Sequence, residues 1–233
     1  MPFKAALFDA YGTVLDVTSA TRRLVAENRF PELADKADSL TSLWRSRQLH
    51  YSWLRSLMGR PTSFWQLTED GLDFALASVG LAGDDDLRDA LLALYRDISA
   101  YDDASHILPA LKEAGLLCGI LSNGNHKMLD DALGSAGLLP HFDKIVSAED
   151  CAIFKPAPQI YQMGCDAFGI SADEVLFFSS NGWDIAGAGS FGYRTIWVNR
   201  TNEVIEELPA KPSHIVSDLT EGLALALHLH QSA

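Results

Sequence analysis

The sequence predicts an α/β fold, in which a parallel β-sheet lies between two layers of helices and a helical block is inserted after the first strand. Two observations predict this fold class. From residue 116 onward, short apolar runs alternate with helical patterns. One further apolar strand, at residues 3–8, stands alone before residues 18–100, where only helical periodicity occurs. The first strand therefore joins a sheet whose other strands follow the helical block.

The expected elements follow in order along the chain. In the helical block, apolar residues recur at helical spacing, for example Leu40, Leu43 and Trp44, and Pro31 and Pro61 separate the helices. Further helices are expected at residues 85–99, 105–114, 127–136, 159–168 and 218–228, and strands at residues 116–121, 144–147, 175–178, 193–198 and 213–216. We therefore expect a three-layer Rossmann-like core and a helical cap domain, formed by residues 1–15 with 101–233 and by residues 16–100, respectively.

Composition and charge narrow the class of protein. Of the 233 residues, 48% are hydrophobic, which predicts a soluble globular protein rather than a disordered one. The formal net charge of -13 argues against a nucleic-acid partner, because phosphate backbones need Lys and Arg to neutralise them. Any anionic substrate has to be drawn in by local positive groups, since the overall field is negative.

The cysteines and the apolar runs predict the location of the protein. Cys118, Cys151 and Cys165 are odd in number and lack the spacing of a metal site, so we expect free thiols in a reducing compartment. No apolar run is long enough to span a bilayer, and the N-terminus does not resemble a signal peptide. We therefore expect no membrane partner and a cytoplasmic protein.

Asp9 is the most informative residue, because it ends the first strand and precedes a turn that contains Gly12. Ligands of open parallel sheets bind beyond the carboxyl ends of the strands. A carboxylate at that place is a candidate covalent nucleophile. The alternative is an aspartate that only forms a turn, and the other clusters at strand ends decide between the two readings.

Three more polar clusters follow expected strands. Ser122 and Asn123 precede a helix, where free N–H groups favour an anion, although a capping turn is the alternative. Lys155 lies in a Pro-rich loop and either supports an anion or faces solvent. The last cluster contains a hydroxyl, an amide, an indole that belongs to the core or to a pocket wall, and a carboxylate: Ser180, Asn181, Trp183 and Asp184.

The residues around Asp9 argue against phosphate chemistry. Enzymes that transfer phosphate from such a position usually carry a second acid two residues later, and here that residue is Tyr11. A metal site needs several oxygen ligands, and Ser180 at the centre of the last cluster weakens the case for magnesium. We therefore expect a nucleophile that acts without a metal or other cofactor.

Taken together, the four clusters have the order and spacing of the haloacid dehalogenase superfamily, and the chain most resembles its L-2-haloacid dehalogenases. The resemblance covers nearly the whole chain. It rests on the run from Phe8 to Thr13, the Leu-Ser-Asn-Gly run from Leu121, the Lys-Pro loop, the run from Ser179 to Asp184, the cap segments 43–45 and 48–55, and the strand region 192–199. The phosphatases of this superfamily carry acids at the positions of Tyr11 and Ser180.

The resemblance implies a hydrolase that converts short L-2-haloalkanoic acids into D-2-hydroxy acids and halide ions. Asp9 attacks Cα in line with the carbon–halogen bond and inverts that centre. Water then hydrolyses the resulting ester at the Asp9 carbonyl carbon, with Asp184 as the base and Lys155 beside it. The cap closes over the site and excludes water during the first step.

The resemblance also assigns the remaining residues. Arg45 and Asn123 stabilise the departing halide, and the substrate carboxylate is bound by Lys155, by the Ser122 hydroxyl and by backbone N–H groups. The catalytic group is therefore Asp9, Arg45, Lys155, Asp184, Asn181, Thr13, Ser179 and Tyr161. The substrate-binding group is Ala10, Tyr11, Ser122, Asn123, Leu49, Phe64 and Trp183.

Two other functions stay open at this stage. One is a phosphatase or phosphomutase of the same superfamily with an unusual metal site, and the other is a non-catalytic binding module on this fold. Intact Asp9, Lys155 and Asp184 argue against the second. Members of the family are often homodimers, and the aromatic cap helix around Trp44 and Trp53 is a candidate interface. The sequence does not fix chain-length preference or whether fluoride is released.

Overall fold

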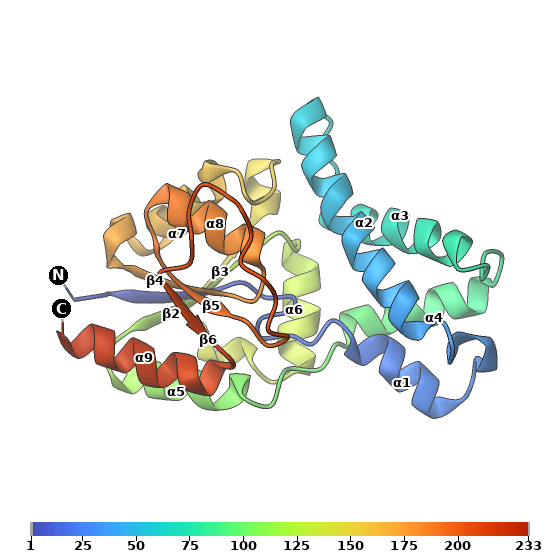
Figure 1. Ribbon diagram of the computed structural model, residues 1–233, viewed down its shortest axis with the longest axis horizontal. Helices are drawn as coiled ribbons and strands as arrows, with labels where there is room; N and C mark the ends of the chain where they lie inside the picture. The colour runs from blue at the N-terminus through green and yellow to red at the C-terminus, as the bar shows by residue number, and fades with distance from the viewer. Residues whose placement is uncertain (1, 233) are drawn as a thin grey trace.

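The computed structural model describes residues 2–232 and consists of a sheet with flanking helices and a separate group of helices beside it (Figure 1). The sheet is six-stranded and parallel, with the order β3-β2-β1-β4-β5-β6. Its strands are β1 (Ala5–Phe8), β2 (Leu117–Ser122), β3 (Lys144–Ser147), β4 (Val175–Ser179), β5 (Arg194–Val198) and β6 (His214–Val216). The predicted α/β fold class is confirmed.

The central strands form because they are apolar on both faces. Every residue of β1 and β4 is buried, which is the pattern of a parallel sheet covered by helices on two sides. In Figure 1, α5 and α9 lie on one side of the sheet and α7 and α8 on the other. The helices that follow the cap are α5 (Ala104–Glu113), α6 (His126–Ser135), α7 (Pro158–Phe168), α8 (Gly182–Phe191) and α9 (Leu219–Ser232).

The register brings the predicted clusters to one edge of the sheet. Phe8, the last residue of β1, pairs with Ile120 of β2 on one side and with Phe178 of β4 on the other. The backbone N–H of Asp9 donates to the carbonyl oxygen of Phe178 over 2.9 Å. The residues that follow β1, β2 and β4 therefore emerge together beyond the carboxyl ends of these strands.

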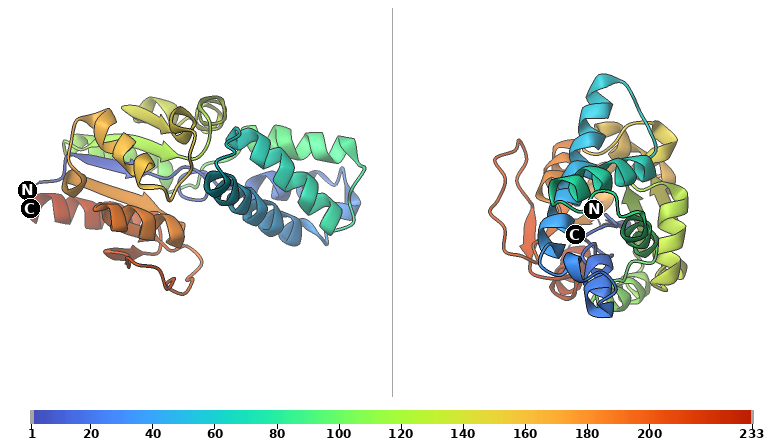
Figure 2. Two further views of the ribbon diagram at one scale, coloured as in Figure 1. Left: turned by 90° about the horizontal axis from the view of Figure 1, so that it is seen from above. Right: turned by 90° about the vertical axis from the view of Figure 1, so that its right-hand side faces the viewer.

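The cap consists of four helices that lie beyond this edge, as the views in Figure 2 also show. They are α1 (Ser19–Glu27), α2 (Ala37–Met58), α3 (Phe64–Ser78) and α4 (Asp85–Arg96). Capping side chains set two of their starts: Ser63 accepts from the N–H of Gln66 over 3.1 Å, and Asp84 from that of Leu87 over 2.9 Å. Short 3₁₀ helices occur at Pro31–Leu33, Leu139–His141, Ala148–Cys151 and Ala172–Glu174.

The chain enters and leaves the cap side by side. Leu15 and Ala100 form an antiparallel bridge, and the N–H of Asp16 donates to the carbonyl oxygen of Ser99 over 2.8 Å. These paired crossings support our division of the chain into a core and a cap at residues 15–16 and 100–101. That division stays an interpretation.

Three further expectations concern the surface and the thiols. Cys118, Cys151 and Cys165 are free, as expected. Within residues 2–232, no helix combines the length and the hydropathy that crossing a membrane requires. Trp44 itself cannot contribute to the interface expected around Trp44 and Trp53, because only 4% of this residue is exposed and its indole N–H donates to the carbonyl oxygen of Thr68 inside the cap. The homodimer itself stays a prediction.

Candidate active site

Asp9 is held by three side-chain donors at the edge of the sheet. Its carboxylate oxygens accept from Lys155 Nζ over 3.2 Å, from Asn181 Nδ2 over 2.9 Å and from Thr13 Oγ1 over 3.2 Å. Only 6% of the residue is exposed. The three donors come from three separate loops, so the orientation of the carboxylate depends on the folded core as a whole.

Lys155 is fully buried between two carboxylates. Its Nζ lies 3.2 Å from Asp9 Oδ1 and 2.8 Å from Asp184 Oδ2, and 4.9 Å from the centre of the Phe177 ring. Burial by itself lowers the pKa of Lys155, but the carboxylates of Asp184 and Asp9 outweigh it and raise the pKa above its ordinary value. Lys155 is therefore a permanent cation that keeps two carboxylates together in a buried site.

Asp184 lies in the first turn of α8, where the helix N-terminus favours negative charge. It is fully buried, and besides Lys155 it accepts from the Tyr161 hydroxyl over 2.8 Å. Burial raises the pKa of Asp184, and the charge of Lys155 opposes that shift. Burial and the nearby Asp184 carboxylate also raise the pKa of Tyr161, so its hydroxyl keeps its proton and remains a donor.

The loop after β4 is fixed by hydrogen bonds to the nucleophile loop. The N–H of Ser180 donates to Thr13 Oγ1 over 2.8 Å, and the N–H of Asn181 donates to Ser179 Oγ over 3.2 Å. The indole N–H of Trp197 donates to the Ser180 carbonyl oxygen over 3.0 Å. Ser179 thus acts on the loop that presents Asn181, whereas Thr13 contacts both this loop and Asp9.

Arg45 reaches the site from the cap. Its Nη2 on α2 donates to the carbonyl oxygen of Tyr11 over 2.7 Å and to Asn181 Oδ1 over 3.1 Å. Gly12 makes this approach feasible: its φ is +94°, and a Cβ there would stand 3.1 Å from Ser180 Oγ and 3.4 Å from Arg45 Nη2. The cap and the core therefore meet directly at the nucleophile loop.

Ser122 and Asn123 hold the backbone of the site. Ser122 Oγ accepts from the N–H of Gly124 over 3.1 Å, and Asn123 Oδ1 accepts from the N–H of Lys155 over 2.8 Å. Both side chains are buried. The backbone carbonyl oxygen of Ala10 accepts from the N–H of Thr13, and no hydrogen bond found within residues 2–232 uses the N–H of Ala10 or of Tyr11.

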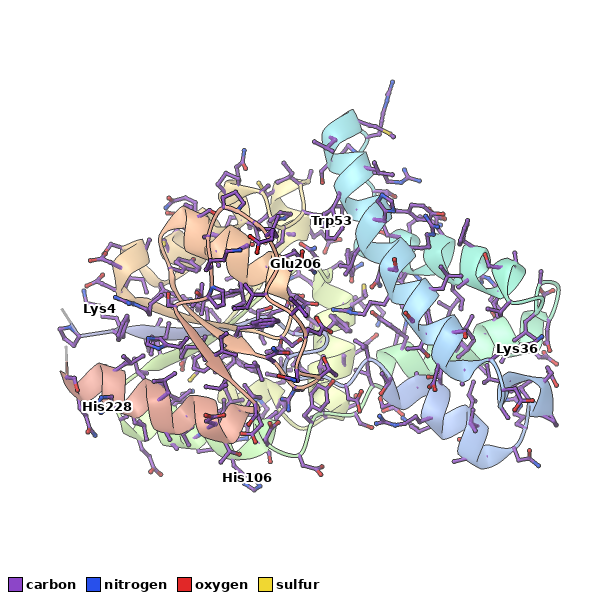
Figure 3. All side chains as sticks on the ribbon, in the orientation of Figure 1. Lys4, Lys36, Trp53, His106, Glu206 and His228 are labelled. Carbon is purple, nitrogen blue, oxygen red and sulfur yellow. The ribbon has the colours of Figure 1, made fainter. Side chains whose placement is uncertain are left out.

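Among the predicted pocket walls, Leu49, Phe64 and Trp183 border three hollows. A cleft of about 1010 Å³ between cap and core is lined by Arg45, Leu49 and Trp183, among others. Phe64 instead lies with Asn123 at a smaller cavity of about 220 Å³. Trp183 also borders an apolar groove of about 650 Å³ together with Trp53 and Glu206, two residues that are labelled in Figure 3. The two indole rings meet edge to face, with centroids 5.4 Å apart.

Comparisons with known proteins identify the family. Residues 3–192 match the model of the haloacid dehalogenase-like hydrolases. The chain is 46% identical over 230 residues to (S)-2-haloacid dehalogenase 1 of Pseudomonas sp. (strain CBS-3), and the match covers 99% of each protein. The chain belongs to the (S)-2-haloacid dehalogenases.

Solved dehalogenase structures share the fold. The crystal structure of a dehalogenase with an intermediate complex is 44% identical, has a TM-score of 0.91 and covers 96% of this chain and 97% of that one. The L-2-haloacid dehalogenase from Xanthobacter autotrophicus with chloropropionic acid covalently bound is 32% identical, has a TM-score of 0.83 and covers 96% of this chain and 98% of that one. The likeness thus includes both the core and the cap of this dehalogenase.

Sequence reasoning gave no role to Tyr95, whose ring stacks on that of Tyr11 with centroids 5.4 Å apart. Leu87, Leu91 and Tyr95 recur every four residues on the buried face of α4, so the tyrosine is indistinguishable from a core residue in the sequence. Only the folded cap shows that this ring crosses from the cap to the nucleophile loop.

Helix α8, which carries Asp184, packs closely on Tyr161, and this close approach requires a glycine at position 187. A Cβ at Gly187 would stand 2.5 Å from the Tyr161 hydroxyl and 2.7 Å from Pro156 Cβ. We expect Gly187→Ala to lower the free energy of unfolding by about 1–3 kcal/mol through overpacking, as measured by urea denaturation. Halide release should also slow, because the displaced hydroxyl no longer donates to Asp184.

Gly134→Ala on α6 is the matched control. Apart from its chain neighbours and the backbone of its own helix, no heavy atom lies within 4 Å of a Cβ built at Gly134. We therefore expect unchanged activity and a stability equal to or up to about 1 kcal/mol above that of the wild type. If Gly187→Ala unfolds and turns over like the wild type, the close packing on Tyr161 does not matter to the site.

Proposed function

We propose that this dehalogenase hydrolyses short-chain L-2-haloalkanoic acids to D-2-hydroxy acids through an ester on Asp9. The main support for this function is the placement of the Asp9 carboxylate, which is held by Lys155, Asn181 and Thr13 just beyond the end of β1. Such donors fix the direction from which the carboxylate attacks, as nucleophilic catalysis requires. The covalently bound chloropropionic acid in the Xanthobacter relative supports a covalent route.

In the first step, a carboxylate oxygen of Asp9 forms a bond to Cα of the substrate. The carbon–halogen bond breaks, the halide leaves with the bonding electrons, and the configuration at Cα inverts. Arg45 is the cation that the cap brings to this place, and its contacts with Tyr11 and Asn181 hold it beside the nucleophile loop. Negative charge that grows on the halide is stabilised by such a preorganised donor.

In the second step, water attacks the Asp9 carbonyl carbon and the acyl C–O bond breaks. One proton of the water ends on the oxygen of the departing hydroxy acid, the other is released to solvent, and Asp9 regains its carboxylate. Asp184 is the base for the water, since it is buried within reach of the same Lys155 ammonium as Asp9. Its raised pKa makes it a stronger base than an exposed aspartate.

The substrate carboxylate needs donors of its own. The N–H groups of Ala10 and Tyr11, the two residues after Asp9, make no hydrogen bond within the described residues. We assign the carboxylate to these N–H groups, with Lys155 and the Ser122 hydroxyl beside them. Leu49 and Trp183 line the cleft through which the alkyl group enters.

We also propose that the reaction needs no metal ion. Tyr11 and Ser180 stand where the phosphatases of the superfamily have acids. The donors around Asp9 are an ammonium, an amide and a hydroxyl, which hold an anion rather than a cation.

A direct assay separates this function from its alternatives. We expect halide release from L-2-chloropropionate to persist in excess EDTA, and D-2-chloropropionate to be left intact. p-Nitrophenyl phosphate with magnesium should give almost no turnover. Phosphatase activity without halide release would support a phosphatase, and no release across short haloacids would support a binding module.

A further inference from the structure

We propose that Gln48 and Tyr95, two buried polar residues of the cap, are positioning residues that hold Arg45 and the Tyr11 ring in place for halide departure. Neither contacts the reacting atoms, so their effect is transmitted through Arg45 and Tyr11. This inference rests on the proposed function, because it concerns the step in which the halide leaves.

Gln48 lies in the middle of α2, one turn beyond Arg45, and only 1% of it is exposed. Its Nε2 donates to Thr68 Oγ1 over 2.6 Å and to the Tyr95 hydroxyl over 3.2 Å. Gly71 of α3 allows this close packing, because a Cβ there would stand 3.1 Å from the backbone nitrogen of Gln48. The hydrogen bonds therefore fix the rotation of α2 about its own axis, and with it the direction in which Arg45 points.

Tyr95 joins this network to the core. Its hydroxyl lies 3.3 Å from Gln48 Oε1, to which it can donate, and its ring lies almost parallel to that of Tyr11, at an angle of 13°. The Tyr11 hydroxyl donates to the carbonyl oxygen of Met128 over 3.2 Å, so the core fixes this ring from the other side. Tyr95 thus stacks on the ring of Tyr11, and the backbone carbonyl oxygen of the same Tyr11 accepts from Arg45.

The network continues to a third residue of the predicted site. Thr68 Oγ1 donates to the carbonyl oxygen of Phe64 over 2.8 Å. The network therefore adjoins three residues that the family resemblance assigns to the substrate or the halide. They are Arg45, one helical turn from Gln48, Phe64, which is bonded to Thr68, and Tyr11, which stacks on Tyr95. A connected hydrogen-bond network of this kind orients several side chains together.

Packing does not explain why these residues are polar. Burying an amide and two hydroxyls has a desolvation cost, and apolar groups of the same shape would fill the cap about as well. What an apolar replacement cannot supply is direction, because hydrogen bonds specify orientation and apolar contacts do not. We therefore assign the network to positioning rather than to stability.

Tyr95→Phe is the test, since it removes the hydroxyl and keeps the stacked ring. We expect the single-turnover rate of chloride release from L-2-chloropropionate to fall about threefold to tenfold, the effect of one lost hydrogen bond. Bromide release from L-2-bromopropionate should fall less, because the weaker carbon–bromine bond demands less stabilisation of the leaving ion. Gln48→Met should change the chloride-to-bromide ratio in the same direction.

Tyr51→Phe is the control. Tyr51 lies on α2, as Gln48 does, and no hydrogen bond of its hydroxyl was found within residues 2–232. The substitution should leave the rates of chloride and bromide release unchanged. Equal losses for chloride and bromide, or none, in both Tyr95→Phe and Gln48→Met would overturn the positioning role. A wild-type protein that releases no halide would overturn the proposed function and this inference with it, so the two failures are distinguishable.

Discussion

Asp9→Ala is expected to lower kcat for halide release by about 10⁴-fold or more, because no other group can form the ester. The protein should nevertheless stay folded. Asp9 and Asp184 share the single Lys155 cation, and removing Asp9 leaves one buried ion pair with balanced charge. We therefore expect the Tm of Asp9→Ala to match or exceed that of the wild type, while activity is lost.

A single turnover in ¹⁸O-water tests the same step without a mutation. If water attacks the Asp9 carbonyl carbon as proposed, the first turnover should leave the label on Asp9 and not in the hydroxy acid. Label that appears directly in the product would mean that water attacks Cα, and Asp9 would then be a base rather than a nucleophile. Substantial activity in Asp9→Ala would contradict the ester route in another way.

The core of the site could be predicted because parallel sheets obey a strong geometric rule. Asp9 directly follows one apolar strand, Asn181 and Asp184 come within five residues of the end of another, and the ends of adjacent parallel strands lie together. The order of the apolar runs therefore sufficed to bring these residues to one edge. Lys155 needed more than this rule: its loop precedes a helix, and the family resemblance rather than the pattern placed its ammonium beside Asp9.

The cap could be predicted only in outline. Helical periodicity marks a buried face but does not say which other helix covers it. Trp44 was therefore taken for part of an interface, although it packs on Tyr95 inside the cap. Tyr95 was overlooked for the same reason, since the sequence does not show which core residue touches it. The division of the predicted pocket walls among three hollows likewise depends on how cap and core meet.

Lys155→Met is expected to have the second large effect, on both activity and stability. The substitution leaves Asp9 and Asp184 buried without their cation, so kcat should fall by about 10³-fold. The free energy of unfolding should fall by about 3–5 kcal/mol, the cost of breaking a buried ion pair by removing one partner. Lys127→Met is the control, because Lys127 forms an exposed pair with Asp131 that is worth about 1 kcal/mol or less.

The dependence on pH separates loss of this charge from simple loss of packing. Burial raises the pKa of Asp184 and the Lys155 charge opposes that shift, so the pKa rises further in Lys155→Met. A base has to be ionised, and the acid limb of the residual activity should therefore move to higher pH. Protonation also removes the uncompensated buried charge, so the stability gap between variant and wild type should narrow as the pH falls through the raised pKa. If urea denaturation shows that the difference in the free energy of unfolding between wild type and Lys155→Met does not depend on pH, then Lys155 stabilises the site through packing and not through its charge.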